Sequence, residues 1–297
     1  MLSRRLVLFL CIFMFTINLS SCKKTEIKMI VPSGSPQFAQ LHMQASKNYD
    51  VTIIQGADPL VAAFSSESYD IIFAPTNLGV KLYDSKPTYQ LIASITWGNY
   101  YLISKSEINI EHINEKEIVA FGRNQTPDAI LQYVFEETLL NITYLDSLTS
   151  VVSDFLQDGS KIYLVAEPSL SVLTHGESLH IIDIQSLYQD KTLEDSYPQA
   201  SVFVHRRLTD RQVDQIKKDL KNSIHKVTQD VSHSADVAIS LNIQIEKVIL
   251  ESAIQNSHIE FKDSMDAKDD IINYLVMLKA FNENFVGAQL PSDDFYR

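Results

Sequence analysis

Short apolar runs alternate with amphipathic stretches along most of this chain. In its first third, apolar and β-branched runs predict strands at residues 27–31, 51–55 and 69–74. The stretches between and after them predict helices at 38–45, 59–66 and 77–83, and residues 89–104 form a long aromatic and β-branched run. Such alternation predicts βαβ units and an α/β fold with mainly parallel sheets.

The alternation starts again near Glu117. It predicts strands at 118–121, 142–145, 161–166, 180–184 and 200–204, with helices at 128–138, at 148–156 and from about Pro168. The spacing in Thr209-Asp210-Arg211-Gln212 is that of a capping box and predicts the start of a long polar helix. We expect the remainder, about 211–282, to be helical, and its clearest apolar face consists of Ile271, Ile272, Leu275, Leu278 and Phe281.

One construction occurs twice, at residues 29–46 and at residues 118–137. Each copy has an apolar strand, a glycine, a hydroxyl residue before a proline (Ser35-Pro36 and Thr126-Pro127) and an amphipathic helix. Proline suits the first helical turn, and the residue before it can cap free backbone N–H groups. In an open α/β sheet such turns lie at the carboxyl edge of the strands, where ligands bind.

The N-terminus has the features of a bacterial lipoprotein signal. Arg4 and Arg5 precede an apolar run, 6–17, that is short for a bilayer span but typical of a secretory signal. Leu19-Ser20-Ser21-Cys22 follows and resembles a lipobox, in which cleavage leaves an acylated cysteine. We therefore expect a signal peptide at 1–21, the lipidated Cys22 with a linker at 22–25, and an extracytoplasmic protein anchored to the bacterial cell membrane. The alternative is an uncleaved anchor in which Cys22 is a free thiol.

Charge and cysteine content narrow the function. The chain has 25 Lys+Arg and 37 Asp+Glu, a net charge of −12, and loss of residues 1–21 would remove two arginines and give −14 (23 minus 37). This excess of acid argues against nucleic-acid binding. The two cysteines are Cys11 and Cys22, so a processed chain would have no thiol for a disulfide, a nucleophile or a thiolate metal site.

A series of short motifs resembles one known family. After the lipobox come "VPSGSP", "YDIIFAPTNLG", "GRNQTPDAIL", "VAEPSLS" and "GAQLPSDDFYR". Their order and spacing resemble the extracytoplasmic solute-binding proteins of ABC importers, in the group that handles nitrate, sulfonates, taurine and thiamine or pyrimidine precursors. The similarity covers essentially the whole processed chain.

The resemblance implies a periplasmic-binding-protein-like II fold, with two Rossmann-like lobes joined by two crossover hinge segments and a ligand cleft between them. Lobe I would comprise 26–102 plus 201–297, and lobe II would comprise 103–200. The crossovers would lie near 100–104 and 199–202. The two copies of the strand–turn–helix construction would then face each other across the cleft, and closure about the hinge would trap the ligand.

Candidate ligand-binding residues lie at the strand ends of lobe I. Ser33, Gly34 and Ser35 could bind through backbone N–H groups and hydroxyls, although Ser35 could instead only cap its helix. Thr76 and Asn77 follow a buried strand and could bind a polar ligand or form a plain N-cap.

The segment Trp97-Gly98-Asn99-Tyr100 is the candidate for stacking on a ligand, because its rings and amide suit a half-polar cleft. The alternative is that these aromatic residues belong to the core.

In lobe II the candidate residues lie on two loops. Arg123 could pair with an anion if it points inward, but arginines on such loops more often face solvent. The loop continues with Asn124, Gln125 and Thr126. Glu167 and Ser169 belong to another loop, where Glu167 could bind an amino group or only complement a helix start. Tyr197 and Gln199, before the return crossover, are weaker candidates.

The motifs favour a receptor over an enzyme. The sequence contains no HExxH, GxSxG or Walker motif and no GxGxxG after its first strand, and the spacing of His175 and His180 does not suit a metal site on one helix face. We expect no cofactor and no metal, and partners that consist of a small-molecule ligand, an ABC permease with its ATPase, and the membrane. We expect a monomer. The alternatives are an enzyme of the same fold acting on a small heterocycle, or a surface lipoprotein without a transport role.

Overall fold

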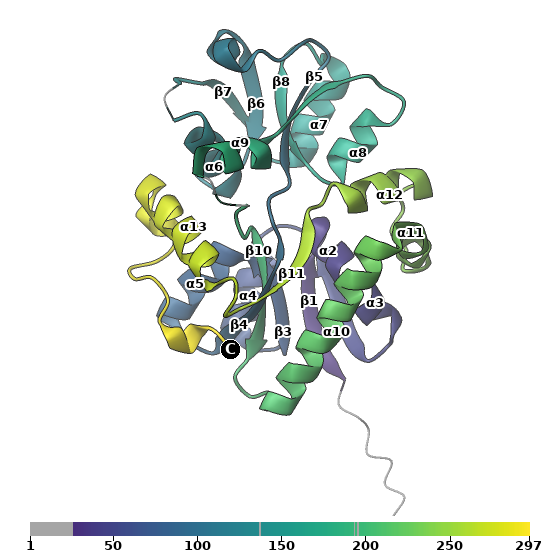
Figure 1. The fold of residues 1–297 in the computed structure, drawn as a ribbon, viewed down its shortest axis with the longest axis vertical. Helices are drawn as coiled ribbons and strands as arrows, with labels where there is room; N and C mark the ends of the chain where they lie inside the picture. The colour runs from purple at the N-terminus through teal and green to yellow at the C-terminus, as the bar shows by residue number, and fades with distance from the viewer. Residues whose placement is uncertain (1–25, 137, 193, 195) are drawn as a thin grey trace, which may run out of the picture.

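A computed structural model describes residues 26–136, 138–192, 194 and 196–297. Their strands form two sheets, one above the other in Figure 1, with helices around each and a gap crossed by a few chain segments. The expected signal peptide, 1–21, and the segment 22–25 with Cys22 lie outside the described residues. In the described part of the chain, no helix has both the length and the hydropathy needed to cross a membrane.

The lower sheet has six strands in the order β11-β4-β10-β3-β1-β2. Their bounds are β1 Ile27–Pro32, β2 Tyr49–Ile54, β3 Ile71–Pro75, β4 Tyr89–Thr96, β10 Ala200–His205 and β11 Ile259–Asp263. Strand β1 pairs in parallel with β2 and β3, while β10 lies antiparallel between β3 and β4, and β11 is antiparallel to β4. Strands β1 to β4 therefore all point the same way, which confirms the mainly parallel arrangement.

The upper sheet has five strands in the order β7-β6-β8-β5-β9. Their bounds are β5 Tyr100–Ser104, β6 Glu117–Phe121, β7 Asn141–Leu145, β8 Ile162–Ala166 and β9 His180–Asp183. Strand β6 is parallel to β7 and β8, and β5 runs antiparallel between β8 and β9. Each sheet therefore contains one strand, β10 or β5, that enters from the other sheet and runs against its parallel neighbours.

Helices cover both sheets (Figure 1). Those of the lower lobe are α2 Ser35–Ala39, α3 Leu41–Ala45, α4 Asp58–Ser66, α5 Thr76–Ser85, α10 Asp210–Gln229, α11 Val231–Ser240, α12 Lys247–Gln255 and α13 Lys268–Phe281. Those of the upper lobe are α6 Thr126–Val134, α7 Leu148–Gln157, α8 Ser169–Thr174 and α9 Ile184–Thr192. Three short 3-10 helices span Ile110–Glu115, Glu283–Phe285 and Asp293–Phe295.

The strand residues alternate between two cores. In β1, Met29 and Val31 join the core under α2, α3 and α10, whereas Ile30 joins the core under α4 and α5. Both faces are buried, as is typical of a strand inside a parallel sheet. The core that contains Ile30 continues into the upper lobe. Beside it, Tyr197 of the connecting segment stacks on Tyr274 of α13 in the lower lobe, with ring centroids 5.8 Å apart. The two lobes therefore share apolar packing beside the crossovers.

The chain crosses between the sheets twice. Strand β4 ends at Thr96 and β5 begins at Tyr100, so residues 97–99 make the first crossing. The second crossing lies between α9 and Ala200, where β10 begins. The expected crossovers at 100–104 and 199–202 are therefore wrong by a few residues, since both ranges fall mainly within strands. The lobe boundaries proposed at 102/103 and 200/201 lie within a few residues of these crossings and stay a prediction.

Three element predictions need correction. The helix expected at 38–45 is two helices, α2 and α3, and the run 89–104, for which no single element was predicted, forms two strands in different sheets. Helix α9 follows β9 without having been predicted. Strand β11 interrupts the stretch 211–282 that was expected to be helical, because residues 259–263 form the antiparallel edge beside β4. The capping box at Thr209 and Gln212 is confirmed at the start of α10.

Candidate ligand-binding cavity

A cavity of about 350 Å³ lies at the ends of the strands, between the two lobes. It is lined from below by the turns after β1, β2 and β3, from above by those after β6, β7 and β8, and from the side by both crossing segments. The lining residues are Pro32, Ser33, Gly34, Ser35, Pro36, Gly56, Ala57, Leu60, Pro75, Asn99, Tyr100, Phe121, Gln125, Thr126, Pro127, Leu148, Ala166, Glu167, Gln199 and Ala200. Ligands of open α/β sheets bind at this carboxyl edge.

The twice-built strand–turn–helix unit contributes to both walls of this cavity. Residues 33–36 come from the lower copy and residues 125–127 from the upper one. Proline occupies the first turn of α2 and of α6, as expected. The sequence repetition therefore corresponds to two facing turns at one cavity.

Eight of the predicted site residues line the cavity. They are Ser33, Gly34, Ser35, Asn99, Tyr100, Gln125, Thr126 and Glu167, and the weaker candidate Gln199 joins them. Ser35 does not cap its helix as the alternative suggested, because the N-cap of α2 is Gly34 and no side chain caps it. The Ser35 hydroxyl instead donates to the Ser257 hydroxyl at 2.9 Å.

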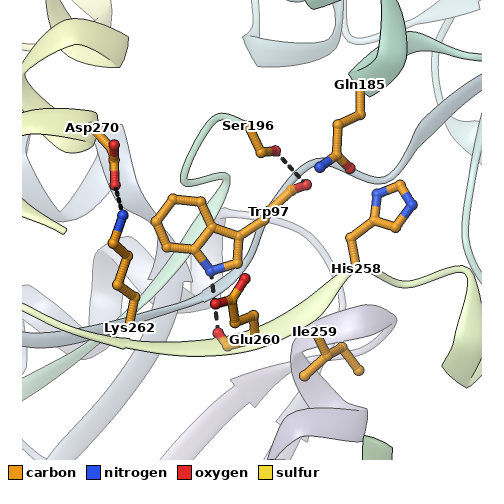
Figure 2. A pocket seen from close by; sticks show the side chains of 8 residues that line it. All are labelled: Trp97, Gln185, Ser196, His258, Ile259, Glu260, Lys262 and Asp270. Atoms are coloured by element: carbon orange, nitrogen blue, oxygen red, sulfur yellow. Dashed lines mark hydrogen bonds and ion pairs between the residues drawn. The ribbon is translucent and has the colours of Figure 1, made fainter. Parts of the chain in front are cut away.

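Trp97 does not lie in this cavity, which corrects its expected role in stacking on a ligand. Its ring lines a separate cavity of about 240 Å³, and its indole N–H donates to the Glu260 carbonyl at 3.2 Å (Figure 2). The Lys262 ammonium lies 5.2 Å from the ring centroid and pairs with Asp270. In an extended chain residues 97 and 99 would face the same side, but Gly98 has φ +76° and ends that alternation.

The buried polar residue Thr76 is bonded to the second crossing segment and to β10. Its hydroxyl lies 2.7 Å from that of Ser201, and its backbone N–H donates to the Gln199 carbonyl. Asn77 donates to the Phe285 carbonyl at 3.2 Å. Neither side chain lines the cavity, and Pro75 is the N-cap of α5, so neither the ligand role nor the cap role fits their placement.

Three predicted residues of the upper lobe also lie outside the cavity lining. Arg123 is exposed, with its guanidinium 5.5 Å from the centroid of the Tyr144 ring. Asn124 is exposed in a left-handed conformation, and its N–H donates to Asp128 at 2.7 Å. Ser169 is the half-buried first residue of α8. Arg123 and Asn124 thus lie at the exposed tip of the turn after β6, outside the cavity.

Glu167 is the charged side chain among the described residues that line the cavity. It is only 3 % exposed, and its two oxygens accept from the backbone N–H and the hydroxyl of Ser171 at 3.2 and 2.8 Å. Burial raises the pKa of this carboxyl, and hydrogen bonds from Ser171 and Asn256 oppose the rise. Glu167 thus both complements the start of α8, as the alternative held, and lies at the cavity.

Aromatic and aliphatic surface completes the cavity. Tyr100 and Phe121 lie edge to face, with ring centroids 6.2 Å apart, and Leu60 and Leu148 add apolar surface from the two lobes. Burial raises the pKa of Tyr100 well above the ordinary tyrosine value, so its hydroxyl is neutral at physiological pH. Apolar walls with a few oriented polar groups are typical of sites for small organic molecules.

Sequence reasoning missed the residues that precede or follow the polar turns. Gly56 and Ala57 follow β2, and Phe121 ends β6, so their positions at strand ends could have indicated them. Leu60 and Leu148 lie inside helices, and no local signal distinguishes them from core residues.

No family model matches this chain, and no curated protein matches it in sequence. Similar solved structures include an ABC transporter protein from Parabacteroides distasonis, with a TM-score of 0.82 at 20% identity over 92% of this chain and 99% of the other. The periplasmic aliphatic sulphonate binding protein SsuA from Escherichia coli has a TM-score of 0.69 at 9% identity, over 90% and 92% of the two chains. The chain has the periplasmic-binding-protein-like II fold.

A further structural neighbour was solved with zinc bound. The ligand-binding component of an ABC-type import system from Staphylococcus aureus, with zinc bound, has a TM-score of 0.68 at 14% identity, over 91% of this chain and 96% of the other. Among the described residues here, no three His, Cys, Asp or Glu side chains cluster so as to hold a metal ion. The three neighbours named here are thus an ABC transporter protein, a sulphonate-binding protein and a ligand-binding component of an import system.

Proposed function

We propose that this protein is the extracytoplasmic solute receptor of an ABC importer, anchored through a lipid on Cys22. It captures a small organic nutrient between its lobes and delivers it to a permease, and it performs no chemistry. The observation that supports this most directly is the 350 Å³ cavity formed by facing turns of two sheets. The lobes close over a bound ligand, and the permease recognises this closed conformation.

Two ligand classes follow from the resemblance. One is a sulfonate or taurine-like anion, as the names of several structural neighbours suggest, and the other is a compound of the thiamine or pyrimidine type. An anion was expected to use Arg123 and the helix N-termini, and a ring compound was expected to use Trp97, Tyr100 and Glu167. Arg123 and Trp97 lie outside the cavity, whereas Tyr100, Glu167 and the first turns of α2 and α6 line it.

A thermal-shift screen of the purified protein tests the receptor function. Taurine, alkanesulfonates, nitrate, thiamine, aminopyrimidines and riboflavin are suitable compounds, and a true ligand raises the melting temperature with its concentration. Each hit is then incubated with the protein and recovered for mass spectrometry. Recovery of unchanged compound supports a receptor, and conversion of the compound would favour an enzyme of this fold.

A matched pair of variants locates the binding. Ala57→Trp places a large ring at a residue that lines the cavity, and Ala280→Trp places one at an exposed position of α13 outside it. We expect the first variant to lose the ligand-induced shift and the second to keep it. A shift that survives in Ala57→Trp contradicts the proposed site. Neighbouring genes for a permease and an ATPase would separate a receptor from a surface lipoprotein without a transport role.

A further inference from the structure

Two residues that line the cavity each have a buried side-chain acceptor without a hydrogen-bond partner. Asn99 is 5 % exposed, and its Oδ1 has no hydrogen-bond partner among the described residues. The same holds for the buried Oε1 of Gln199, on the other crossing segment. Both residues line the cavity. A buried acceptor without a donor is costly, so these atoms indicate what a ligand has to supply.

A relay of hydroxyl groups fixes which end of the Asn99 amide is free. The Ser257 hydroxyl donates to the Ala253 carbonyl at 2.6 Å, which can only accept. Ser257 must therefore accept from Ser35, at 2.9 Å, and Ser35 has no second proton to give. Ser35 then accepts from the Asn99 Nδ2, at 2.8 Å. The amide nitrogen is thus committed to Ser35, and the oxygen remains for a ligand.

The charge around the cavity is negative. Glu167 lines it, and none of the described lining residues is Lys, Arg or His. Three of the helices that begin at the cavity have an acid at their start. Asp58 lies in the first turn of α4, the buried Asp128 accepts from the Asn124 N–H at the start of α6, and Glu167 accepts from the Ser171 N–H at the start of α8. Carboxylates therefore already complement the positive ends of these three helices, whereas α2 and α7 have no acid in their first turns.

We propose that the ligand is a compact organic amine, and that the cavity disfavours oxyanions such as sulfonate or nitrate. This inference rests on the proposed receptor function and names the ligand class of the same site. Amine N–H groups donate to Asn99 Oδ1 and Gln199 Oε1, and Glu167 supplies the counter-charge. The two Glu167 oxygens accept two bonds from Ser171 and one from the Asn256 side chain, which leaves about one of their four lone-pair sites for the amine. A volume of about 350 Å³ is near the lower end for ligand sites, so the amine is small.

Matched ligand pairs test this inference. Benzylamine with benzylsulfonate, and butylamine with butanesulfonate, differ only in the charged group, while 4-aminopyrimidine and nitrate extend each class. Each is titrated into the purified protein at millimolar concentrations by calorimetry and thermal shift. We expect at least one amine to bind and its sulfonate partner not to bind. If the sulfonates bind as tightly as the amines, the inference is overturned but the receptor function is still supported. The same conclusion holds if the sulfonates bind and none of the amines does. If no compound in either class binds, the inference is also overturned, while the wider screen and mass spectrometry decide the receptor function.

Two cavity variants and one control identify the groups responsible. Gln199→Met and Glu167→Gln should each weaken amine binding about tenfold, because each removes an acceptor or a charge from a buried contact. Gln185→Met is the control, since Gln185 Oε1 is also buried without a partner but lines the separate cavity of Figure 2. It should bind as the unmodified protein does. Unchanged affinity in both Gln199→Met and Glu167→Gln overturns the assignment of these two residues as amine-binding groups. If Glu167→Gln perturbs folding, Gln199→Met alone provides the test.

Discussion

At the scale of single residues, Glu167 combines a structural and an electrostatic role. Its carboxylate accepts from the Ser171 backbone and hydroxyl and thereby fixes the start of α8. Burial disfavours its charged form and raises its pKa above the ordinary value of 4.5. Between that value and the raised one, the folded protein retains a proton that the unfolded chain has lost. The contribution of Glu167 to stability therefore falls as pH rises through this interval.

Glu167→Gln should remove this contribution. Relative to the variant, the unmodified protein should lose unfolding free energy as pH rises above 4.5. The difference between the two proteins should become constant above the raised pKa of Glu167. Urea denaturation of both proteins over a series of pH values measures the difference. Other carboxyls, such as Glu67 and Asp294 with lowered pKa values, cancel in the comparison. A difference that does not change with pH would contradict a raised Glu167 pKa.

At the scale of elements, the three residues between β4 and β5 decide which side chains line the main cavity. Trp97 is held against β11 by its indole N–H and by its backbone N–H, which donates to the His258 carbonyl. Gly98 then takes a left-handed conformation, and Asn99 lies at the main cavity. A Cβ on Gly98 would meet the buried Tyr197 ring at 2.9 Å. The crossing therefore depends on glycine for both its backbone conformation and its packing.

Gly98→Ala should be markedly more destabilising than the same change at Gly176. Gly176 has φ +79°, close to the +76° of Gly98, but nothing lies within 4 Å of its added Cβ. We expect a loss of about 1 kcal/mol at Gly176 from conformation alone and of about 2 kcal/mol or more at Gly98, where the clash adds to it. Chemical denaturation of the two variants measures both values. Equal losses would show that Tyr197 moves aside without cost.

At the scale of the whole molecule, the lobes are connected by more than the two crossings. The Tyr101 hydroxyl of β5 donates to the Asn256 carbonyl at the end of α12, at 2.6 Å. His258 also lies 3.6 Å from Asp183 of the upper lobe. The segment between α12 and β11 thus contacts the upper lobe and also carries Ser257 of the Asn99 relay. Any closing motion of the lobes has to preserve or rearrange these contacts.

The proposed lipid anchor gives a prediction for the whole protein in its cell. Cys22→Ala removes the residue that would be acylated and should leave an uncleaved precursor. We expect the unmodified protein to fractionate with membranes and to lose its signal peptide in a globomycin-sensitive way. Immunoblotting of cell fractions, with and without globomycin, measures both effects. Identical processing of the unmodified protein and Cys22→Ala would contradict the anchor.

The sequence by itself determined the α/β class, most strand positions and the two facing turns, because these follow from local periodicity and from glycine and proline at strand ends. It also located Asn99, Tyr100 and Glu167 at the edge of the sheets where the cavity lies. Strand β11 was missed because its pairing with β4 is a long-range contact that outweighs local helical preference.

Only the tertiary structure decided which polar residues face the cavity. Thr76 bonds to Ser201, Arg123 lies beside Tyr144, and Trp97 faces a second cavity, although all three follow strands as the lining residues do. The orientation of the Asn99 amide likewise depends on Ser257 and Ala253, which are far away in the sequence. Side-chain direction at a turn is set by partners from other elements, and those partners meet only when the chain has folded.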